Sequence, residues 1–311
     1  MDALLQSLLP IFLIIILGGV LKRHLITSEE GWVGMERLGY FVLFPILLAR
    51  TLYRTDFASL SAGTAALAFL IACLALLATM YLIRAFLQPL LGLEDRGYSS
   101  FYQSTTRWNA FVILAIAEQM GSGPWLAIVA IAIGTMIVPI NIVNIMVLTA
   151  LGRGSGNQQS FVMQVIRNPL IVGVAIGLGI NASGLSIPGP LDITLELLAR
   201  ITLPLGLLLI GAGLRVRMPG RDMVAVALSS ALKLFMMPFF FGTAAWLLGI
   251  SGQEFMAMVL CGTGPTAMNG YLLARQMGGD APMFAAMVTA QTALSFFTIP
   301  LVMAIAQWVG G

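Results

Sequence analysis

The chain has 311 residues, of which 59% are hydrophobic and only 9% are charged. A soluble protein carries roughly 25% charged residues, and so apolar a surface is untenable in water. The composition therefore excludes a soluble protein and predicts a polytopic protein embedded in the lipid bilayer. The formal charge of +3 reflects cytoplasmic loops and gives no argument for a nucleic-acid partner, because the sequence offers no soluble domain to hold one.

Apolar windows of membrane-helix length recur along the chain. A membrane helix needs about 20 predominantly apolar residues, whereas transmembrane β-strands alternate in polarity over about 10 residues. No such alternation occurs, so the sequence predicts an all-α integral membrane protein. We predict ten transmembrane helices, at residues 3–21, 33–53, 60–83, 99–120, 124–151, 168–182, 192–214, 223–249, 253–275 and 283–308.

Positive charges fall into alternate gaps between these windows. Cytoplasmic loops are enriched in Lys and Arg, and the gaps after the odd-numbered spans carry nearly all of them. In the opposite set of gaps Arg50 and Arg54 are the only basic residues. We therefore expect both termini to lie on the non-cytoplasmic side. The basic residues after the odd-numbered spans are Lys22, Arg23, Arg84, Arg96, Arg153, Arg167, Arg215, Arg217, Arg221 and Arg275.

The two halves of the chain carry similar features in the same order. Spans two and seven contain Pro45 and Pro204, and spans five and ten carry the late prolines Pro139 and Pro300. Five spans per half would insert the two copies with opposite orientation, and inverted repeats of this kind are a transporter architecture whose substrate site lies near the midplane. We predict a first five-helix repeat at 1–151, a cytoplasmic linker at 152–165 and a second, inverted repeat at 166–311.

Span nine is predicted to be broken. Its run from Cys261 to Gly270 contains three glycines and a proline, and Pro265 removes a helix hydrogen bond and clashes with the preceding turn. Unwound backbone at membrane depth survives only when it is buried in protein or lines a wet cavity. Polar Thr266 and Asn269 beside Gly264 favour a functional break over a kink packed through its glycines.

Span four places six polar residues among the seven from Gln103 to Asn109. If its helix starts at residue 98, Arg107 lies about 14 Å deep, close to the centre of a core of about 30 Å. A charge there is costly unless it faces protein or water. The alternative is that span four starts later and Arg107 anchors the helix at the cytoplasmic edge. If span four is discontinuous, the positive end of a half-helix dipole points at the site and favours an anion.

Several other polar residues lie within predicted spans. Lys233 is too deep for its side chain to reach the interface, so its partner must be another helix, a carbonyl or the substrate, and its role is either functional or a tie between helices. Asn141, Asn144 and Gln291 are candidates to line the same cavity or to bridge helices.

The sequence gives no sign of an enzyme. It contains neither HExxH nor GxGD, and the lone His24 cannot furnish a usual zinc site. We therefore expect no catalytic residue, no metal and no cofactor. Coupling to Na⁺ or H⁺ stays open, although a carboxylate proton relay is disfavoured because no Asp or Glu lies at the midplane of a predicted span.

The charge alternation, the Pro-bearing span nine and the runs at 167–170 (RNPL) and 210–213 (IGAG) together resemble the auxin efflux carrier family in its compact bacterial form. The similarity covers essentially the whole length, and the family belongs to a wider group that includes bile-acid/sodium symporter-like transporters. The resemblance implies a scaffold of helices 1, 2, 6 and 7, and a transport domain of helices 3–5 and 8–10. It also implies elevator-type alternating access and a homodimer in the bacterial cytoplasmic membrane.

The same resemblance implies that helices 4 and 9 are the crossing helices, with polar crossings at Thr106 to Asn109 and at Gly264-Pro265 to Asn269. Plant relatives export auxin, while bacterial relatives are linked to small carboxylates such as malate or malonate. This chain lacks the span-four proline and the long central loop of the plant pattern, so auxin itself is a poor guess for the substrate.

The leading hypothesis is a secondary active or potential-driven transporter of small organic anions. Arg107 and Asn109 would hold the carboxylate, helped by Thr266 and Asn269, and Lys233 would supply background positive potential. The alternatives are a sodium-coupled organic-anion symporter of the bile-acid-symporter type, and a channel or receptor without alternating access. Neither the substrate nor the direction of transport follows from the sequence.

Overall fold

The computed structural model describes residues 2–55, 61–121, 123–152, 169–214 and 223–310, and all regular structure within these ranges is helical. The predicted all-helical architecture is therefore confirmed for this part of the chain. The linker predicted at 152–165 lies outside the described residues except for Gly152.

Helix occupies each of the ten predicted windows, and four windows contain more than one helical segment. The π-helical segments η1 and η4 interrupt two of them, a feature that is frequent at functional sites. The segments are α1 (Asp2–His24), α2 (Glu29–Leu38), η1 (Gly39–Leu43), α3 (Phe44–Tyr53), α4 (Ala62–Leu82), α5 (Arg84–Leu90), α6 (Asp95–Thr106), α7 (Ala110–Gln119), α8 (Trp125–Leu151), α10 (Pro169–Ser183), α11 (Gly189–Gly213), α12 (Met223–Ala231), η4 (Leu232–Met236), α13 (Met237–Leu247), α14 (Gly252–Gly262), α15 (Gly270–Gln276) and α16 (Ala281–Gly310).

Some of these stretches are typical membrane spans by length and composition alone. Within the described residues, α10 is a shorter apolar helix, and six stretches are long and apolar enough to cross a bilayer. These six stretches are Glu29–Tyr53, Ala62–Leu82, Trp125–Leu151, Gly189–Gly213, Met223–Leu247 and Ala281–Val309.

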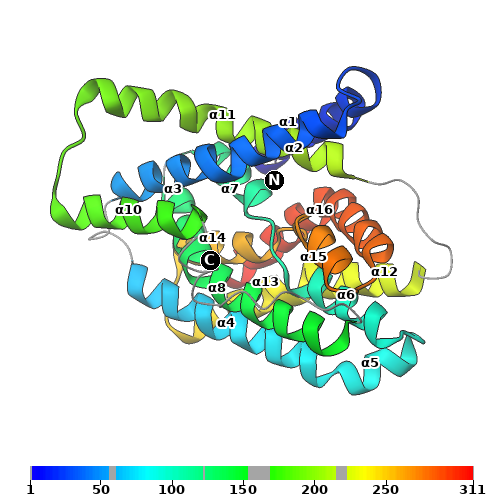
Figure 1. Cartoon of the computed structure of the whole chain (residues 1–311). Coiled ribbons are helices and arrows are strands. Elements are labelled where there is room, and N and C mark those ends of the chain that lie inside the picture. The colour runs from blue at the N-terminus through cyan, green and yellow to red at the C-terminus, as the bar shows by residue number, and fades with distance from the viewer. Residues whose placement is uncertain (1, 56–60, 122, 153–168, 215–222, 311) are drawn as a thin grey trace.

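The helices form two layers (Figure 1). One layer contains α1 packed along α11 and α10 packed along α3, while the other contains α4, α8, α13, α14 and α16. The α1–α11 contact is so close that a Cβ on Gly211 would overlap the carbonyl oxygen of Ile15. Helix α7 belongs to the second layer and lies on its inner face, since it packs against α8 and α14 and also contacts α1 and α11 of the first layer.

The first interruption separates α6 from α7. The hydroxyls of Thr105 and Thr106 bond back to carbonyls one turn earlier, which is how Ser and Thr compete with the helix ladder. Arg107 and Asn109 then adopt extended backbone conformations. The Asn109 side chain accepts a hydrogen bond from the Phe111 amide at 3.1 Å and so caps the start of α7.

The second interruption separates α14 from α15, and the two interruptions are in contact. Pro265 lacks an N–H and forces the preceding residue out of helical conformation, so helix is absent from residue 263 to 269. The backbone N–H of Asn109 donates to the Pro265 carbonyl at 2.9 Å, and the Trp108 indole N–H donates to the Cys261 carbonyl at 2.5 Å. These bonds satisfy carbonyls that the broken helix leaves free.

Candidate functional site

A cavity of about 1390 Å³ leads to the contact between the two interruptions; it is called the large cavity below. Lys22, Arg23 and His24, at the end of α1, line one part of it. Arg107 and Asn269, from the two interruptions, line another part. The large cavity therefore joins the deep polar residues of both interruptions to the basic end of α1.

Arg107 is the charged group deep in this cavity, and its side chain is held by three amide oxygens. Its Nε donates to Gln103 Oε1 at 2.6 Å, and its two terminal nitrogens donate to Asn269 and Asn141 Oδ1, each at 3.2 Å. The residue is only 4% exposed. The guanidinium is thus fixed in position by α6, α8 and the second interruption together.

None of these partners carries a negative charge. Within the described residues, no carboxylate lies within ion-pair distance of Arg107. A guanidinium has five N–H donors, and the three bonds to amide oxygens leave one N–H on each terminal nitrogen. Guanidinium N–H donors form strong hydrogen bonds to carboxylates, and a buried cation without a counter-ion is costly until an anion arrives.

The backbone around Arg107 is also polarised. Helix α7 starts at Ala110 beside the cavity lining, so the positive end of its dipole faces the same region. Asn109, which is 3% exposed, both caps this helix and lines the cavity. Arg107 itself follows the last turn of α6, where the carbonyl end of that helix stabilises a cation.

The remaining predicted site residues lie away from the lining of the large cavity. Thr106 is fully buried, and its hydroxyl lies 3.1 Å from Asn144 Oδ1. The Thr266 amide donates to Gln291 Oε1 at 3.0 Å, and the Gln291 amide nitrogen lies within hydrogen-bond distance of Ser229 Oγ. These residues connect the elements behind the site.

Gly264 and Pro265 shape the second interruption. A Cβ on Gly264 would lie 2.9 Å from Ile113 Cγ1 and 3.0 Å from Trp108 Nε1, so a larger residue would displace these side chains where the two interruptions meet. Pro265 contributes its carbonyl to Asn109. Both residues therefore act through backbone geometry.

Lys233 lies in η4, fully buried and away from the large cavity. Its Nζ is 2.6 Å from the Sδ of Met237, four residues later. This thioether lies one helical turn away, and a partner on another helix, a carbonyl or the substrate stays a prediction. Within the described residues no group of His, Cys, Asp or Glu side chains could hold a metal ion.

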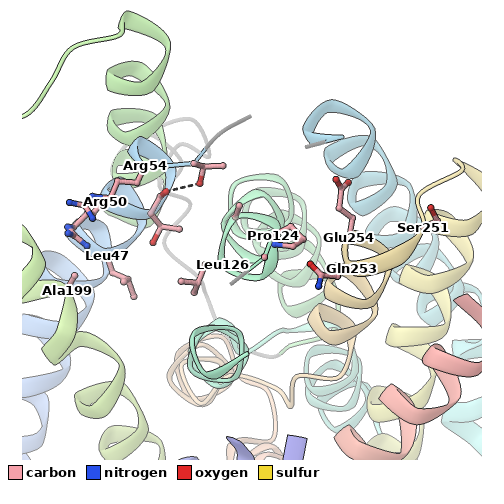
Figure 2. Close-up of a pocket in the computed structure, with 13 residues that line it drawn as sticks. Leu47, Arg50, Arg54, Pro124, Leu126, Ala199, Ser251, Gln253 and Glu254 are labelled. Carbon is pink, nitrogen blue, oxygen red and sulfur yellow. Dashed lines mark hydrogen bonds between the residues drawn. The ribbon is translucent and has the colours of Figure 1, made fainter. Parts of the chain in front are cut away.

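A second cavity of about 800 Å³, called the small cavity below, lies at the other end of α3. Figure 2 shows Arg50 and Arg54 on one side of it and Gln253 and Glu254 on the other. Ion pairs fix the arginines against α11. Arg50 pairs with Glu196 at 2.6 Å and with Asp192 at 3.3 Å, Arg54 pairs with Asp192, and Arg200 pairs with Glu196 at 2.5 Å.

The sequence does not predict the role of two residues of the site, Gln103 and Trp108. Gln103 was only part of a polar run, although its position four residues before Arg107 on one helix is a pattern that places side chains in contact. Trp108 gave no signal, because its partner Cys261 is 153 positions away.

Comparison with known families identifies the chain. The model of one family, described as membrane transport protein and corresponding to the auxin efflux carriers, matches residues 3–303. The chain belongs to the auxin efflux carrier family. It is therefore a multi-pass membrane transporter, and proteins of this family are transporters and not enzymes. No curated protein matches the chain.

Proposed function

We propose that this transporter moves small organic anions, chiefly carboxylates, and binds them at Arg107. The observation that carries the proposal is a buried guanidinium at a cavity wall, held by three neutral amide oxygens with no carboxylate beside it in the described chain. Desolvating a charge is expensive unless an opposite charge approaches it. A bound carboxylate supplies that charge and accepts the two remaining N–H donors.

The proposed substrate site includes Asn109 and Asn269 beside Arg107. Asn269 is exposed and Asn141 half-buried at the cavity wall, so their amides are within reach of the polar groups of a ligand. Six other predicted residues do not line the cavity and support the site by holding the two interruptions together. They are Thr106, Asn144, Gly264, Pro265, Thr266 and Gln291. Lys233 contributes at most a long-range potential, because it does not line the cavity.

The proposed mechanism is elevator-type alternating access in a ten-helix membrane protein built from two inverted repeats. The layer of α1, α2, α3, α10 and α11 corresponds to the scaffold, and the layer of α4–α8 and α12–α16 to the moving domain. The two interruptions belong to the second layer, so the site would travel with it. A homodimer joined through the scaffold, and both termini on the non-cytoplasmic face, complete the proposal.

The driving force of transport has two candidates. The leading candidate is secondary active or potential-driven transport, and the second is coupling to a sodium gradient. One observation favours the second candidate: the Thr266 hydroxyl is fully buried and has no hydrogen-bond partner among the described residues. Hydroxyls and freed carbonyls at broken helices suit Na⁺. Imposing Na⁺ and H⁺ gradients separately on vesicles separates the two candidates.

The direct test is counterflow in proteoliposomes loaded with a panel of small carboxylates. We expect the wild-type protein to exchange at least one of them and Arg107→Ala to exchange none, while the variant stays folded and monodisperse. Arg84→Gln is the matched control, because this arginine lines neither cavity and pairs with Asp95. Unchanged exchange by Arg107→Ala would remove Arg107 from the site.

A further inference from the structure

The large and small cavities approach each other along the same helices. On α3 the large cavity includes Phe44 and the small cavity includes Leu47, only three residues later. That separation is about 4.5 Å along a helix, and positions three apart lie on the same helix face. Helices α8 and α11 also line both cavities, and on each of them the small cavity is lined by residues nearer the N-terminus. The two cavities therefore follow each other along three shared helices.

An aromatic stack lines the large cavity at this point. The rings of Phe44 and Phe111 lie face to face, with centroids 3.7 Å apart and planes inclined by 17°. Phe44 belongs to the first layer and is 1% exposed. Phe111 belongs to α7, two residues after the Asn109 cap, so its position is tied to the interruption that carries Arg107.

Helix α11 is shaped to receive this stack. A Cβ on Gly206 would lie 2.9 Å from Cζ of Phe44 and 3.7 Å from Cβ of Phe111. Only a glycine leaves room there for Phe44 without displacement. The Thr202 hydroxyl, one turn earlier on α11, lies 3.2 Å from the Leu43 carbonyl oxygen and 3.1 Å from that of Leu198, so it shares its hydrogen between the two beside Phe44. The stack is thus seated between three helices from both layers.

We propose that the Phe44–Phe111 stack, seated on Gly206, is the barrier between the two cavities, and that the small cavity is the opposite end of the same anion pathway. Alternating access requires a seal on one side of the site at a time, and a hydrophobic constriction blocks ions by excluding water. Because its two rings come from different layers, the seal opens when the layers slide. This inference rests on the proposed function.

The polar residues of the small cavity agree with this role. Arg54 is half-exposed there, while Arg50 is held by two carboxylates of α11. Gln253 and Glu254 come from the start of α14, in the other layer (Figure 2). The small cavity is therefore bounded by both layers, as an entrance that opens and closes with their relative movement must be.

The test is sided labelling of Thr51→Cys, a position that lines the small cavity. The two native cysteines are buried, so a membrane-impermeant maleimide reports on the new thiol. In the Thr51→Cys protein we expect labelling from one membrane face only. Adding Phe111→Ala, or the milder Phe44→Leu, which keeps an apolar side chain but cannot stack, should raise labelling from the opposite face by about tenfold or more.

Phe241→Ala is the matched control. Phe241 is also fully buried in an aromatic pair, with Phe69, but it lies away from both cavities. It should not change the sidedness of labelling. If both stack variants label from the opposite face as slowly as Thr51→Cys alone, the barrier assignment is overturned. This readout needs no substrate, so its failure is distinct from a failure of carboxylate exchange.

Discussion

Replacing Arg107 separates the charge of the guanidinium from its geometry. Arg107→Gln removes the charge but keeps an amide near Gln103, whereas Arg107→Lys keeps the charge and loses the planar pair of donors. Removing one partner of a buried, hydrogen-bonded charge pair costs about 2–5 kcal/mol of binding free energy. At about 1.4 kcal/mol per tenfold change, even the lower half of this range weakens carboxylate binding by roughly 30-fold or more.

Arg107→Lys should be milder. It loses one of the two hydrogen bonds to the carboxylate, worth about 1.5–3 kcal/mol for a charged group, which corresponds to roughly 10- to 150-fold. We therefore expect the KM for carboxylate uptake to rise from the wild-type protein to Arg107→Lys and again to Arg107→Gln.

The same variants should keep their fold without ligand. Arg107→Gln leaves amide oxygens of Asn141 and Asn269 without their donor, but it also removes a buried charge that has no counter-ion. These effects oppose each other, so we expect the Tm of the ligand-free protein to change by only about 3 °C. A KM for Arg107→Gln within about threefold of wild type, at equal protein incorporation, would refute the reasoning, since losing a contact of about 2 kcal/mol should raise the KM by much more.

Three further predictions concern stability. Gly211→Ala forces a Cβ against a carbonyl of α1 and should lower Tm by about 3–10 °C, whereas Gly179→Ala, with open space around it, should leave Tm unchanged; equal effects would contradict the tight packing. Gln291→Leu removes the acceptor of the Thr266 amide and should destabilise the protein by about 1–3 kcal/mol in detergent melts, and an unaltered melt would speak against this link. Lys233→Met replaces a buried amine by an apolar chain of similar length and should leave Tm equal or higher; a large loss of Tm would assign Lys233 a structural partner beyond its thioether contact.

The local features of the fold could be predicted from the sequence because their causes are local. Apolar length sets where helices lie, and the polar run that contains Arg107 and the glycine–proline run around Pro265 disfavour continuous helix over a few residues. Both runs are the places where helix stops. The number of membrane crossings and the inverted repeat remain predictions.

The contacts of the site could not be predicted, because they join segments far apart in the chain. The contacts of Trp108 with Cys261, of Thr266 with Gln291 and of Phe44 with Phe111 are set by how the helices pack, and no periodicity in one segment reports on its partner. Lys233 makes a local contact that its depth does not predict, because its Nζ lies 2.6 Å from the Sδ of Met237, one helical turn away.

The central claim is that the large cavity binds organic anions through the charge of Arg107. The most direct measurement is a thermal-shift comparison of carboxylates with their matching primary amides on purified protein. A ligand at 100 times its Kd stabilises the native state by about 2.7 kcal/mol, so we predict that at least one acid raises the Tm of the wild-type protein while its amide does not, and that Arg107→Gln abolishes the difference. Equal shifts for acid and amide, or an unchanged difference in Arg107→Gln, would contradict the account.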